Sequence, residues 1–316
     1  MSGLQLLLRQ LRREAEGIVS YEFVSAGDAP LPAFTAGAHI DLQLPGGLQR
    51  SYSLVNDPGD RHHYVIAVDR AADSRGGSAW MHSMPRPGDR LASSVPINDF
   101  PLYEDAPLSI FIAGGIGVTP FMAMAARLNT LGRAWRLHYA VRSRQRAAYV
   151  QELSTLDRSG TSVNLYCTSE DMGRPDIVAI VCDAPAGSHL YCCGPNGMLD
   201  TFTTACAGLA PQRVHLERFS ASQEAATAGG YEVRLARSGK TLGVEAGKTL
   251  LDTLLDAGVP IQYACSQGVC GTCSTPVLEG TPDHRDDYLS NEEKAANQAI
   301  MVCCSGSLTP RLVLDI

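Results

Sequence analysis

The pattern of apolar and polar positions changes twice along this chain of 316 residues. Residues 1–104 consist of short stretches that alternate or are rich in β-branched side chains, such as 38–44 and 64–68, and turn sequences such as Pro-Gly-Gly at 45–47 separate them. Because side chains alternate between two faces along a strand, this pattern predicts an antiparallel β-barrel.

From residue 105 onward the pattern is one of apolar strand, turn and helix. Strands are expected at 109–113, 136–141, 163–167 and 189–193, and helices at 121–131, 147–156 and about 198–208. Strands that alternate with helices predict a parallel sheet covered by helices, here over residues 105–220.

The alternation stops at residues 221–230. This segment is rich in Ser, Ala, Gly and Thr and contains no large apolar side chain, so we do not expect it to bury a core. We expect it to be a linker, followed by a third domain over residues 231–316.

The length of 316 residues fits this division into several domains, because one hydrophobic core seldom extends beyond about 250–300 residues. No apolar stretch is long enough to span a bilayer, and residues 1–17 carry several charges without the apolar run of a secretory signal. We therefore expect a soluble, cytoplasmic protein. The net charge of −7 and the dispersed basic residues predict no binding to nucleic acid or to a membrane.

The spacing of cysteines near the C-terminus is the strongest chemical signal. Cys265, Cys270 and Cys273 form C-x4-C-x2-C, and either Cys303 or Cys304 follows about thirty residues later. This is the spacing with which plant-type ferredoxins hold a 2Fe-2S cluster through four thiolates. The third domain is therefore predicted to carry such a cluster.

The residues between these cysteines support a cluster. Gly268 and Gly271 allow the backbone to wrap closely and to point N–H groups at the sulfurs. Structural zinc is the alternative, but zinc ligands favour two C-x2-C pairs, and the first gap here is too wide. Other cysteines lie on apolar strands or helices and are expected to be inert buried thiols: Cys167, Cys182, Cys192 and Cys206.

Two glycine-containing turns occur in the middle domain. Residues 112–120, Ile-Ala-Gly-Gly-Ile-Gly-Val-Thr-Pro, follow a strand and precede a helix, where glycines let a pyrophosphate approach backbone N–H groups. Pro120 stands where the dinucleotide motif G-x-G-x-x-G has its third glycine, and proline suits the first turn of a helix. The second turn, at 192–197, also follows a strand. An ordinary strand-to-helix turn explains either one alone, but the pair predicts one shared nicotinamide cofactor.

Two segments of the first domain have the residue types of a flavin site. Residues 50–54, Arg-Ser-Tyr-Ser-Leu, supply an arginine for a phosphate, an aromatic ring for stacking and a hydroxyl for a polar ring atom. Residues 75–78, Arg-Gly-Gly-Ser, add a glycine turn with backbone donors for the same phosphate. An ordinary strand and an ordinary loop are the alternatives for each segment alone.

Together these motifs resemble, from end to end, the phthalate dioxygenase reductase and vanillate O-demethylase reductase family of class IA oxygenase reductases. The matching segments are 50–57, 75–78, 113–120, 191–195, 283–286 and 301–303. Their order along the chain, flavin then nicotinamide then cluster, is itself specific. The resemblance implies a ferredoxin-reductase-like core, a C-terminal β-grasp ferredoxin domain, and FMN rather than FAD.

The resemblance also implies roles for residues of the flavin site. Arg50 and Ser78 would hold the FMN phosphate, Tyr52 would pack on the isoalloxazine, and Ser53 would bond near its N5. Phe219 would close the site. The remaining positions expected to contact FMN are Ser51, Ala67, Val68, Gly76 and Gly77.

For the nicotinamide site, the resemblance implies that Thr119 and Cys193 flank the reacting ring, so that Ser53, Thr119 and Cys193 form the expected catalytic set. The segment 301–303, Met-Val-Cys, matches the last cluster ligand of the family, which selects Cys303 rather than Cys304. The other expected contacts of the cofactor are Gly114, Gly115, Gly117, Pro120, Arg142, Gly194 and Pro195.

The choice between NADH and NADPH rests on conflicting signals. An NAD site usually has Asp or Glu about 20 residues past the glycine turn, whereas Val141-Arg142-Ser143-Arg144 stands there in this chain. Charge alone favours the 2′-phosphate of NADPH, and the resemblance implies NADH. We predict NADH, because this nucleotide site is not the fold for which the charge rule was drawn.

Three redox sites in one chain predict a function. Nicotinamide gives up two electrons as hydride and a cluster accepts one, so a flavin must lie between them. We expect electrons to pass from NADH through FMN and the cluster to a separate terminal oxygenase that acts on an aromatic acid or ether. The alternatives are electron supply to a different enzyme and a non-enzymatic redox sensor, although complete flavin and nicotinamide motifs argue against a sensor.

Overall fold

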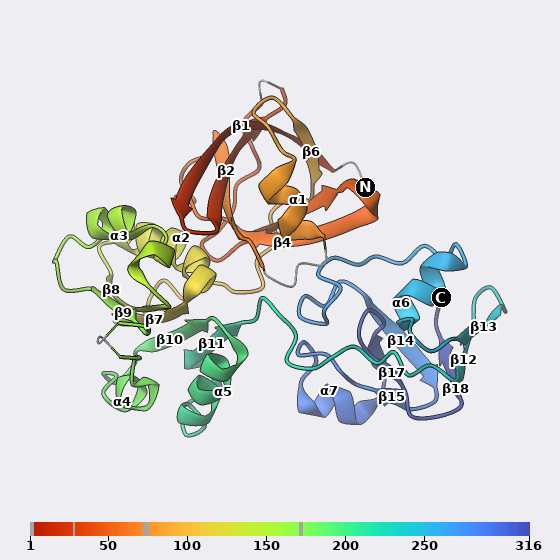
Figure 1. The fold of residues 1–316 in the computed structure, drawn as a ribbon. Coiled ribbons are helices and arrows are strands. Elements are labelled where there is room, and N and C mark those ends of the chain that lie inside the picture. The colour runs from red at the N-terminus through yellow and green to blue at the C-terminus, as the bar shows by residue number, and fades with distance from the viewer. Residues whose placement is uncertain (1–2, 28, 72–75, 171–172) are drawn as a thin grey trace. The chain divides into compact units, whose positions relative to one another are not determined.

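The computed structural model describes residues 3–27, 29–71, 76–170 and 173–316. The chain divides into two compact units, Met1–Phe219 and Ser220–Ile316. The first unit contains a six-stranded and a five-stranded sheet (Figure 1), and the second contains a five-stranded and a two-stranded sheet.

The six-stranded sheet is antiparallel, in the order β4-β3-β6-β1-β2-β5, and it curves around one core (Figure 1). Alternation along the first two strands places Leu6, Leu8, Tyr21 and Phe23 in that core, all of them fully buried. The elements are β1 (Leu4–Ala15), β2 (Ile18–Ser25), β3 (His39–Leu44), β4 (Leu48–Ser53), β5 (His63–Asp69), α1 (Gly77–Ser83) and β6 (Arg90–Ser93).

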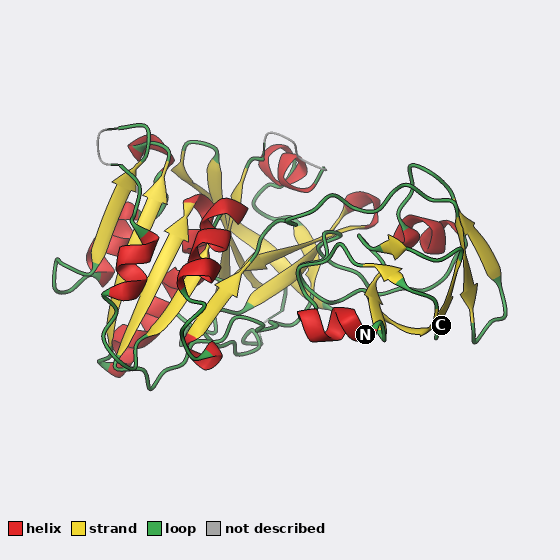
Figure 2. Cartoon of the chain, turned by 90° about the horizontal axis from the view of Figure 1, so that it is seen from below, coloured by secondary structure: helices red, strands yellow, loops and turns green. Residues whose placement is uncertain are grey.

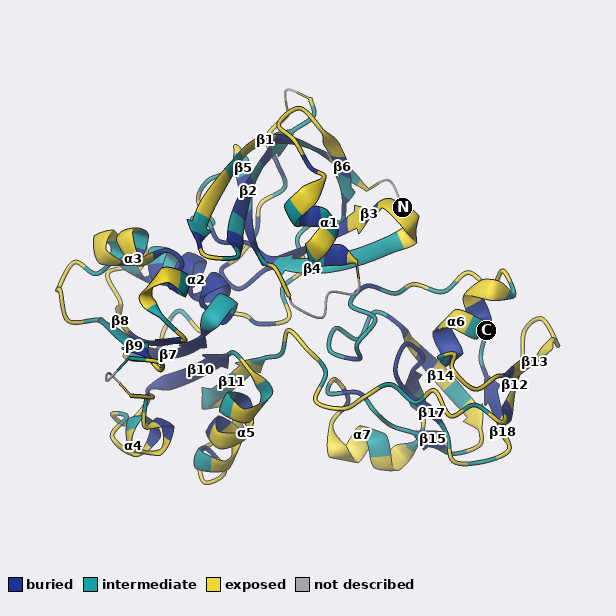
Figure 3. Cartoon of the chain, viewed as in Figure 1, coloured by how far each residue is buried: buried dark blue, intermediate teal, exposed yellow. Residues whose placement is uncertain are grey.

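The five-stranded sheet of the first unit is parallel, in the order β11-β10-β7-β8-β9. Helices α2 and α3 pack on one face and α4 and α5 on the other. Figure 2 shows helices on both sides of this sheet. The central strands β7 and β10 are consequently almost wholly buried (Figure 3). The elements are β7 (Leu108–Gly114), α2 (Thr119–Leu131), β8 (Ala134–Val141), α3 (Val150–Leu156), β9 (Val163–Cys167), α4 (Ile177–Cys182), β10 (His189–Cys193), α5 (Asn196–Ala205) and β11 (Val214–Glu217).

Two helices of this region differ from their predicted bounds, for local reasons. The helix expected over 147–156 begins at Val150, because Tyr149 has a left-handed backbone with φ of 61° that a helix cannot continue. The helix expected over 198–208 begins at Asn196, directly after Pro195. Helix α2 begins as predicted beside Pro120 and ends at Gly132, whose φ of 65° is the left-handed conformation typical of a helix C-terminus.

The second unit is built on a mixed sheet in the order β13-β12-β18-β14-β16. Strand β18 runs parallel to β12 and antiparallel to β14, and helices α6 and α7 each begin with a capping box, at Thr249 and Ser290. The elements are β12 (Tyr231–Leu235), β13 (Thr241–Val244), α6 (Leu250–Asp256), β14 (Ser274–Glu279), β15 (Pro282–Asp283), α7 (Asn291–Ala296), β16 (Ala299–Met301), β17 (Gly306–Ser307) and β18 (Arg311–Leu314). The predicted fold class, with barrel, parallel α/β sheet and β-grasp unit, is confirmed.

The segment predicted to be a linker belongs to the second unit. The amide of Ala226 donates to the carbonyl of Cys304 at 2.7 Å, and the hydroxyl of Ser222 donates to Asp287 at 2.6 Å. The amide of Gly230 donates to Val244 at 2.8 Å. Residues 221–230 therefore have fixed partners in the second unit, and the predicted three-domain bounds stay a prediction.

Within the described ranges, none of the helices has both the length and the apolar character needed to cross a membrane.

Candidate functional site

The four predicted cluster ligands lie together in the second unit. The thiols of Cys265 and Cys270 contact each other, as do those of Cys273 and Cys303, and Cys265 also contacts Cys303. Contact with Cys270 lowers the pKa of the Cys265 thiol, whereas contact with Cys265 raises the pKa of both Cys270 and Cys303. Four neighbouring thiolates repel one another, so only bound cations can hold all four in the charged form.

The contacts join the four thiols in the order Cys270, Cys265, Cys303 and Cys273, and backbone donors stabilise two of the sulfurs. The amide of Gly268 donates to Cys303 Sγ at 3.2 Å, and the amide of Gln267 donates to Cys265 Sγ at 3.3 Å. Four neighbouring thiols suit a 2Fe-2S cluster, and N–H groups directed at sulfur tune the reduction potential of such clusters. Among the described residues, no three His, Cys, Asp or Glu side chains converge on a single metal ion.

The glycines of this loop are required by their neighbours. Gly268 and Gly271 have φ of 72° and 73°. A Cβ atom on Gly268 would overlap the sulfur of Cys304, and one on Gly271 would overlap the ring of Tyr288. The loop can follow this path only with glycine at both positions.

Asp286 lies against Gly268 of this loop, and sequence reasoning assigned it no role. Its carboxylate is fully buried and accepts hydrogen bonds from the amide of Leu289 at 2.8 Å and the hydroxyl of Ser305 at 3.4 Å. The amide of the next residue, Asp287, donates to the carbonyl of Gly268 at 3.0 Å. The acidic residues in the segment 283–286 were the available signal.

Geometry supports Cys303 over Cys304 as the fourth ligand. Cys303 contacts both Cys265 and Cys273, whereas the thiol of Cys304 donates to the carbonyl of Met301 at 3.8 Å. Both cysteines are buried. The choice of Cys303 stays a prediction with this support.

Of the four cysteines expected to be inert buried thiols, three are buried and one is exposed. Burial raises the pKa of Cys192 to about 12 and of Cys206 to about 11, and Cys167 is fully buried, so these three thiols are inert as predicted. The prediction for Cys182 was wrong. It is exposed, because it ends α4 and lies outside the apolar cluster that this helix forms with the sheet.

The two glycine turns of the first unit meet at the centre of its parallel sheet. Strands β7 and β10 are neighbours, with Ala113 paired to Cys193, yet the chain visits β8 and β9 on one side before it returns to β10 on the other. A sheet that reverses its strand order in this way opens a crevice at the carboxyl ends of the two strands, where ligands bind. The predicted nicotinamide site lies at this position.

Three glycines hold the two turns against each other. A Cβ on Gly117 would overlap the carbonyl oxygen of Cys193, one on Gly114 would lie 2.5 Å from Pro195 Cδ, and one on Gly194 would lie 3.0 Å from the amide nitrogen of Gly114. Gly115 differs, because its φ is 56° and nothing lies within 4 Å of its Cβ position. Packing of the turns therefore accounts for Gly114, Gly117 and Gly194, and open space for a pyrophosphate remains beside Gly115.

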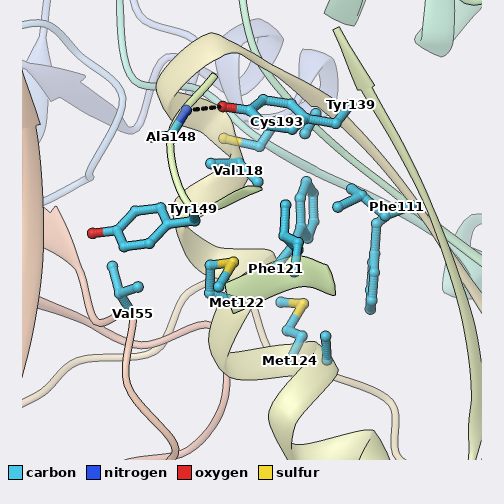
Figure 4. Packing of buried hydrophobic residues seen from close by; sticks show 14 of the residues in the cluster. Val55, Phe111, Val118, Phe121, Met122, Met124, Tyr139, Ala148, Tyr149 and Cys193 are labelled. Atoms are coloured by element: carbon cyan, nitrogen blue, oxygen red, sulfur yellow. Dashed lines mark hydrogen bonds between the residues drawn. The ribbon is translucent and has the colours of Figure 1, made fainter. Parts of the chain in front are cut away.

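Thr119 and Cys193 lie at this junction, and both are buried. The hydroxyl of Thr119 donates to the carbonyl of Ile116 at 2.9 Å. Figure 4 shows Cys193 beside Val118, at the top of the apolar cluster under the turn. Burial raises the pKa of Cys193 well above its usual value, so its thiol is neutral.

Glu217 is a site residue that sequence reasoning missed. Parallel pairing of β10 with β11 sets it opposite Cys193, whose thiol donates to its carboxylate at 3.9 Å. Burial, aided by the negative charge of Asp99, raises the pKa of Glu217 to about 8. A charged side chain at the end of the apolar strand 214–217 was the available signal.

The flavin motif lies on β4, next to β3. The hydroxyl of Ser53 is buried and has no hydrogen-bond partner among the described residues. A buried hydroxyl without a partner costs free energy, so a ligand atom at this position would satisfy it. Tyr52 is partly buried beside the barrel core, and burial raises the pKa of its hydroxyl.

The other residues of the flavin motif lie on β4 and α1 and have different partners. Ser51 donates to Asp41 at 2.5 Å, so its hydroxyl is already engaged. A Cβ on Gly77 would lie 2.9 Å from Arg50 Nε, which shows that the arginine packs on the glycine turn. Ser78 follows in helix α1, and its hydroxyl accepts from the amide of Ala71 at 3.3 Å. Arg50 and Ser78 thus lie at the same turn.

The remaining flavin positions contribute less distinct evidence. Ala67 and Val68 are buried in β5, and Val68 belongs to the barrel core, so only its backbone could face a cofactor. Gly76 has φ of 88° and precedes α1, while Phe219 is 39% exposed at the end of the first unit. Arg75 lies outside the described residues. The roles of these residues stay predictions.

These sites and sheets define a flavin- and iron–sulfur-containing oxidoreductase, and comparison with known proteins makes the class specific. Residues 111–204 match the oxidoreductase NAD-binding domain, and residues 233–306 match the 2Fe-2S iron-sulfur cluster binding domain. The chain is 49% identical over 316 residues to phenoxybenzoate dioxygenase subunit beta of Ectopseudomonas oleovorans, covering 100% of this chain and 98% of the relative. It is 47% identical to tetrachlorobenzoquinone reductase of Sphingobium chlorophenolicum over 320 residues, which cover 100% and 99%.

A solved structure of phthalate dioxygenase reductase, described as modular for electron transfer from pyridine nucleotides to [2Fe-2S], superposes with a TM-score of 0.82. Its sequence identity is 36%, over 99% of this chain and 98% of that one. The chain belongs to the family of phthalate dioxygenase reductase and vanillate O-demethylase reductase. It is an oxidoreductase with an NAD-binding domain and a 2Fe-2S cluster binding domain, and it is similar to a reductase that passes electrons from pyridine nucleotides to [2Fe-2S].

Proposed function

We propose that this protein is the reductase component of a multicomponent oxygenase or O-demethylase, and that it supplies electrons from NADH to a separate terminal oxygenase. One observation carries the proposal, which is that two kinds of redox site occur in one chain. Three thiols of a ferredoxin-type loop lie together with the thiol of Cys303. In the same chain, two nicotinamide-type turns meet at the ends of the neighbouring strands β7 and β10. Bound FMN would supply the conversion between two-electron nicotinamide chemistry and one-electron cluster chemistry, and Arg50, Tyr52, Ser53 and Ser78 would hold it.

At the flavin, the chain's residues bind and orient. Arg50 and Ser78 hold the phosphate, since the arginine packs on the Gly77 turn, and Tyr52 lies against the ring system. The hydroxyl of Ser53 bonds near N5, which would satisfy its buried oxygen. We assign Phe219 to the closing of this site.

At the nicotinamide, the chain provides a neutral, dry surface. The hydroxyl of Thr119 is fixed by the Ile116 carbonyl, and burial keeps the thiol of Cys193 protonated. Glu217 is largely protonated at neutral pH, because burial raises its pKa to about 8. Neutral groups orient the ring without competing for a proton, and hydride transfer needs positioning rather than an acid or base.

For the cluster, we assign Cys265, Cys270, Cys273 and Cys303 as ligands. The acceptor we propose is an oxygenase for an aromatic acid or ether, which docks transiently at the second unit. Phenoxybenzoate dioxygenase subunit beta and vanillate O-demethylase oxidoreductase support this class of partner by their names. The ten cysteines, none of which is in a disulfide, support a reducing cytoplasm as its location.

A second candidate function is direct reduction of a quinone. The observation in its favour is the 47% identical relative named tetrachlorobenzoquinone reductase. In this case electrons would leave for a small aromatic acceptor instead of a protein. The two functions share every site described above and differ only in the acceptor.

A spectral titration under anaerobic conditions tests the proposal. Addition of NADH to the purified protein should bleach the flavin and ferredoxin absorption bands together and produce the EPR signal of a reduced 2Fe-2S cluster. Absence of pyridine-nucleotide oxidation would favour a redox sensor. Reconstitution with a terminal oxygenase and an aromatic substrate, against a tetrachlorobenzoquinone assay, then separates the two candidate acceptors.

A further inference from the structure

We propose that Tyr149 positions the barrel against the parallel sheet, and that it thereby aligns the flavin with the nicotinamide for hydride transfer. The inference rests on the proposed function, because the barrel would hold FMN and the turns of the sheet would hold NADH. The starting observation is that Tyr149 has two unfavourable features. Its backbone is left-handed, with φ of 61°, and its buried hydroxyl has no hydrogen-bond partner among the described residues. Both features cost free energy, and such costs persist where the surrounding structure enforces the conformation, often at functional sites.

Tyr149 lies in a core that the barrel and the parallel sheet share. The apolar cluster under the glycine turns contains Val55 and Ala67 of the barrel as well as Phe121 of α2 and Tyr139 of β8. Tyr149 belongs to this cluster and is 3% exposed, and Figure 4 shows it among the same residues as Val55. Its ring is therefore part of the packing that joins the two sheets of the first unit.

The residues that precede Tyr149 are fastened to the barrel by polar contacts. The amide of Glu16, between β1 and β2, donates to the carbonyl of Gln145 at 2.7 Å. The guanidinium of Arg146 lies 3.1 Å from the carboxylate of Asp69, which ends β5. The segment that follows β8 is thus held by the barrel at two consecutive residues.

The residues that follow Tyr149 are fastened to the barrel as well. The carbonyl of Tyr149 accepts from the amide of Leu153 at 2.8 Å, which closes the first turn of α3. This turn presents Glu152 to Arg12 of β1, and the two form an ion pair. The left-handed residue therefore stands between two attachments to the barrel, and its conformation decides whether both can form.

The chemistry of the reaction makes this placement important. The flavin motif lies on β4 of the barrel and the glycine turns lie on β7 and β10 of the sheet, so the packing of barrel against sheet sets the distance between the reacting atoms. Hydride transfer needs these atoms about 3–3.5 Å apart, and a misplacement of about 1 Å can cost roughly a hundredfold in rate. Tyr149 is a positioning residue, because it acts through the placement of the barrel.

The test uses the full-length protein with its cofactors and the variant Tyr149→Ala, which removes the ring. We expect the limiting rate of flavin reduction by NADH, measured by stopped flow, to fall about tenfold or more, while the dissociation constant for NADH changes less than about threefold. The long-wavelength charge-transfer absorbance of reduced flavin with NAD⁺ should weaken in parallel, and it reports alignment without turnover. Tyr149→Phe should restore both signals and raise the urea midpoint, because the ring positions the barrel and the hydroxyl lacks a partner.

Val181→Ala is the matched control, because Val181 is buried in the separate cluster on the other face of the sheet. It should lower the urea midpoint without changing the limiting rate or the charge-transfer absorbance. Arg146→Gln is the second variant. It removes the ion pair with Asp69 but keeps the ring of Tyr149, and the limiting rate should fall about threefold.

An unchanged limiting rate in Tyr149→Ala, or a fall that Val181→Ala reproduces, would overturn the proposal. Failure of Tyr149→Phe to restore the rate would overturn the assignment to the ring. If Tyr149→Ala does not fold, an unchanged rate in Arg146→Gln overturns the proposal instead. The proposed function fails separately, when NADH reduces neither the flavin nor the cluster of the wild-type protein.

Discussion

Two regions suited to redox groups differ in the atoms that they offer. The cluster loop of the second unit offers side-chain thiols, and the paired turns of the first unit offer backbone groups. Residues 265–273 form an irregular loop that carries the thiols of Cys265, Cys270 and Cys273, which we propose as cluster ligands. At the turns after β7 and β10, Gly114, Gly117 and Gly194 allow the two turns to pack together, and the backbone of Gly115 borders open space.

This difference explains why one site is conspicuous in a sequence and the other is not. Thiolate ligands must be cysteines at fixed spacing, so few sequences match by accident. Backbone donors at a helix start require only glycine and a strand before them, which many turns have. The thiol site depends on particular residues, and the turn site depends on how strands are ordered.

The largest expected effect is loss of the cluster when one of its thiol ligands is replaced. Cys270→Ser should remove nearly all of the cluster, because a serine oxygen is a poorer ligand for iron and the cluster needs four thiolates. FMN should remain bound. Loss of the EPR signal of the reduced cluster, with flavin absorption retained, is the measurement. Cys304→Ser is the control, and cluster loss there with Cys303→Ser unaffected would overturn the choice of ligand.

The next effect separates the two regions physically. A protein that ends at Phe219, where the first unit ends, should fold, bind FMN and reduce ferricyanide with NADH. Its rate of cytochrome c reduction should fall to roughly a tenth or less, because the cluster is absent. This fall corresponds to a rise of ~1.4 kcal/mol or more in activation free energy. Undiminished cytochrome c reduction would show that electrons leave directly from the flavin.

A smaller effect tests the contact between the two glycine turns. Gly117→Ala should force the two turns apart, because its Cβ would overlap the Cys193 carbonyl. We expect a loss of about 1–3 kcal/mol in unfolding free energy. The kcat/KM for NADH should fall by about tenfold to a hundredfold.

Gly197→Ala is the control for this experiment, since nothing lies within 4 Å of its Cβ position and it occupies helix α5. It should be neutral or stabilising by up to about 1 kcal/mol. Equal damage from both substitutions would mean that the contact between the turns is not what Gly117 provides.

The smallest effect concerns pH. Burial raises the pKa of Glu217 from 4.5 to about 8, so between these values the unfolded chain loses a proton that the folded protein keeps. Stability should therefore fall as pH rises from about 4.5 to 8 and then level off. Glu217→Gln should reduce this slope and stabilise the first unit at pH 8, on the order of 1 kcal/mol given partial exposure.

Urea unfolding followed by release of flavin fluorescence at pH 5 and pH 8 measures this effect. Glu152→Gln, which alters an exposed carboxylate of the same unit, should retain the slope of the wild-type protein. An identical pH dependence in wild type and Glu217→Gln would mean that the carboxylate is ionised in the folded state.

The sequence by itself determined what depends on local chemistry. The spacing of Cys265, Cys270 and Cys273 predicts the cluster without knowledge of the fold, because neighbours in one loop are neighbours in space. Strand and helix patterns likewise predict the barrel and the parallel sheet, since each pattern reflects burial of one face. Where the prediction was wrong, at the start of α3, a single left-handed residue, Tyr149, decided the outcome.

Tertiary structure alone decided which distant residues meet at a site. Glu217 meets Cys193 across 24 residues, because parallel strands with a helix between them bring such positions into register. Sequence reasoning near the glycine turns missed this acid. Hydrogen bonding between neighbouring strands brings these residues together. Which strands are neighbours depends on the order of strands in the sheet, and the spacing of residues along the sequence does not reveal that order.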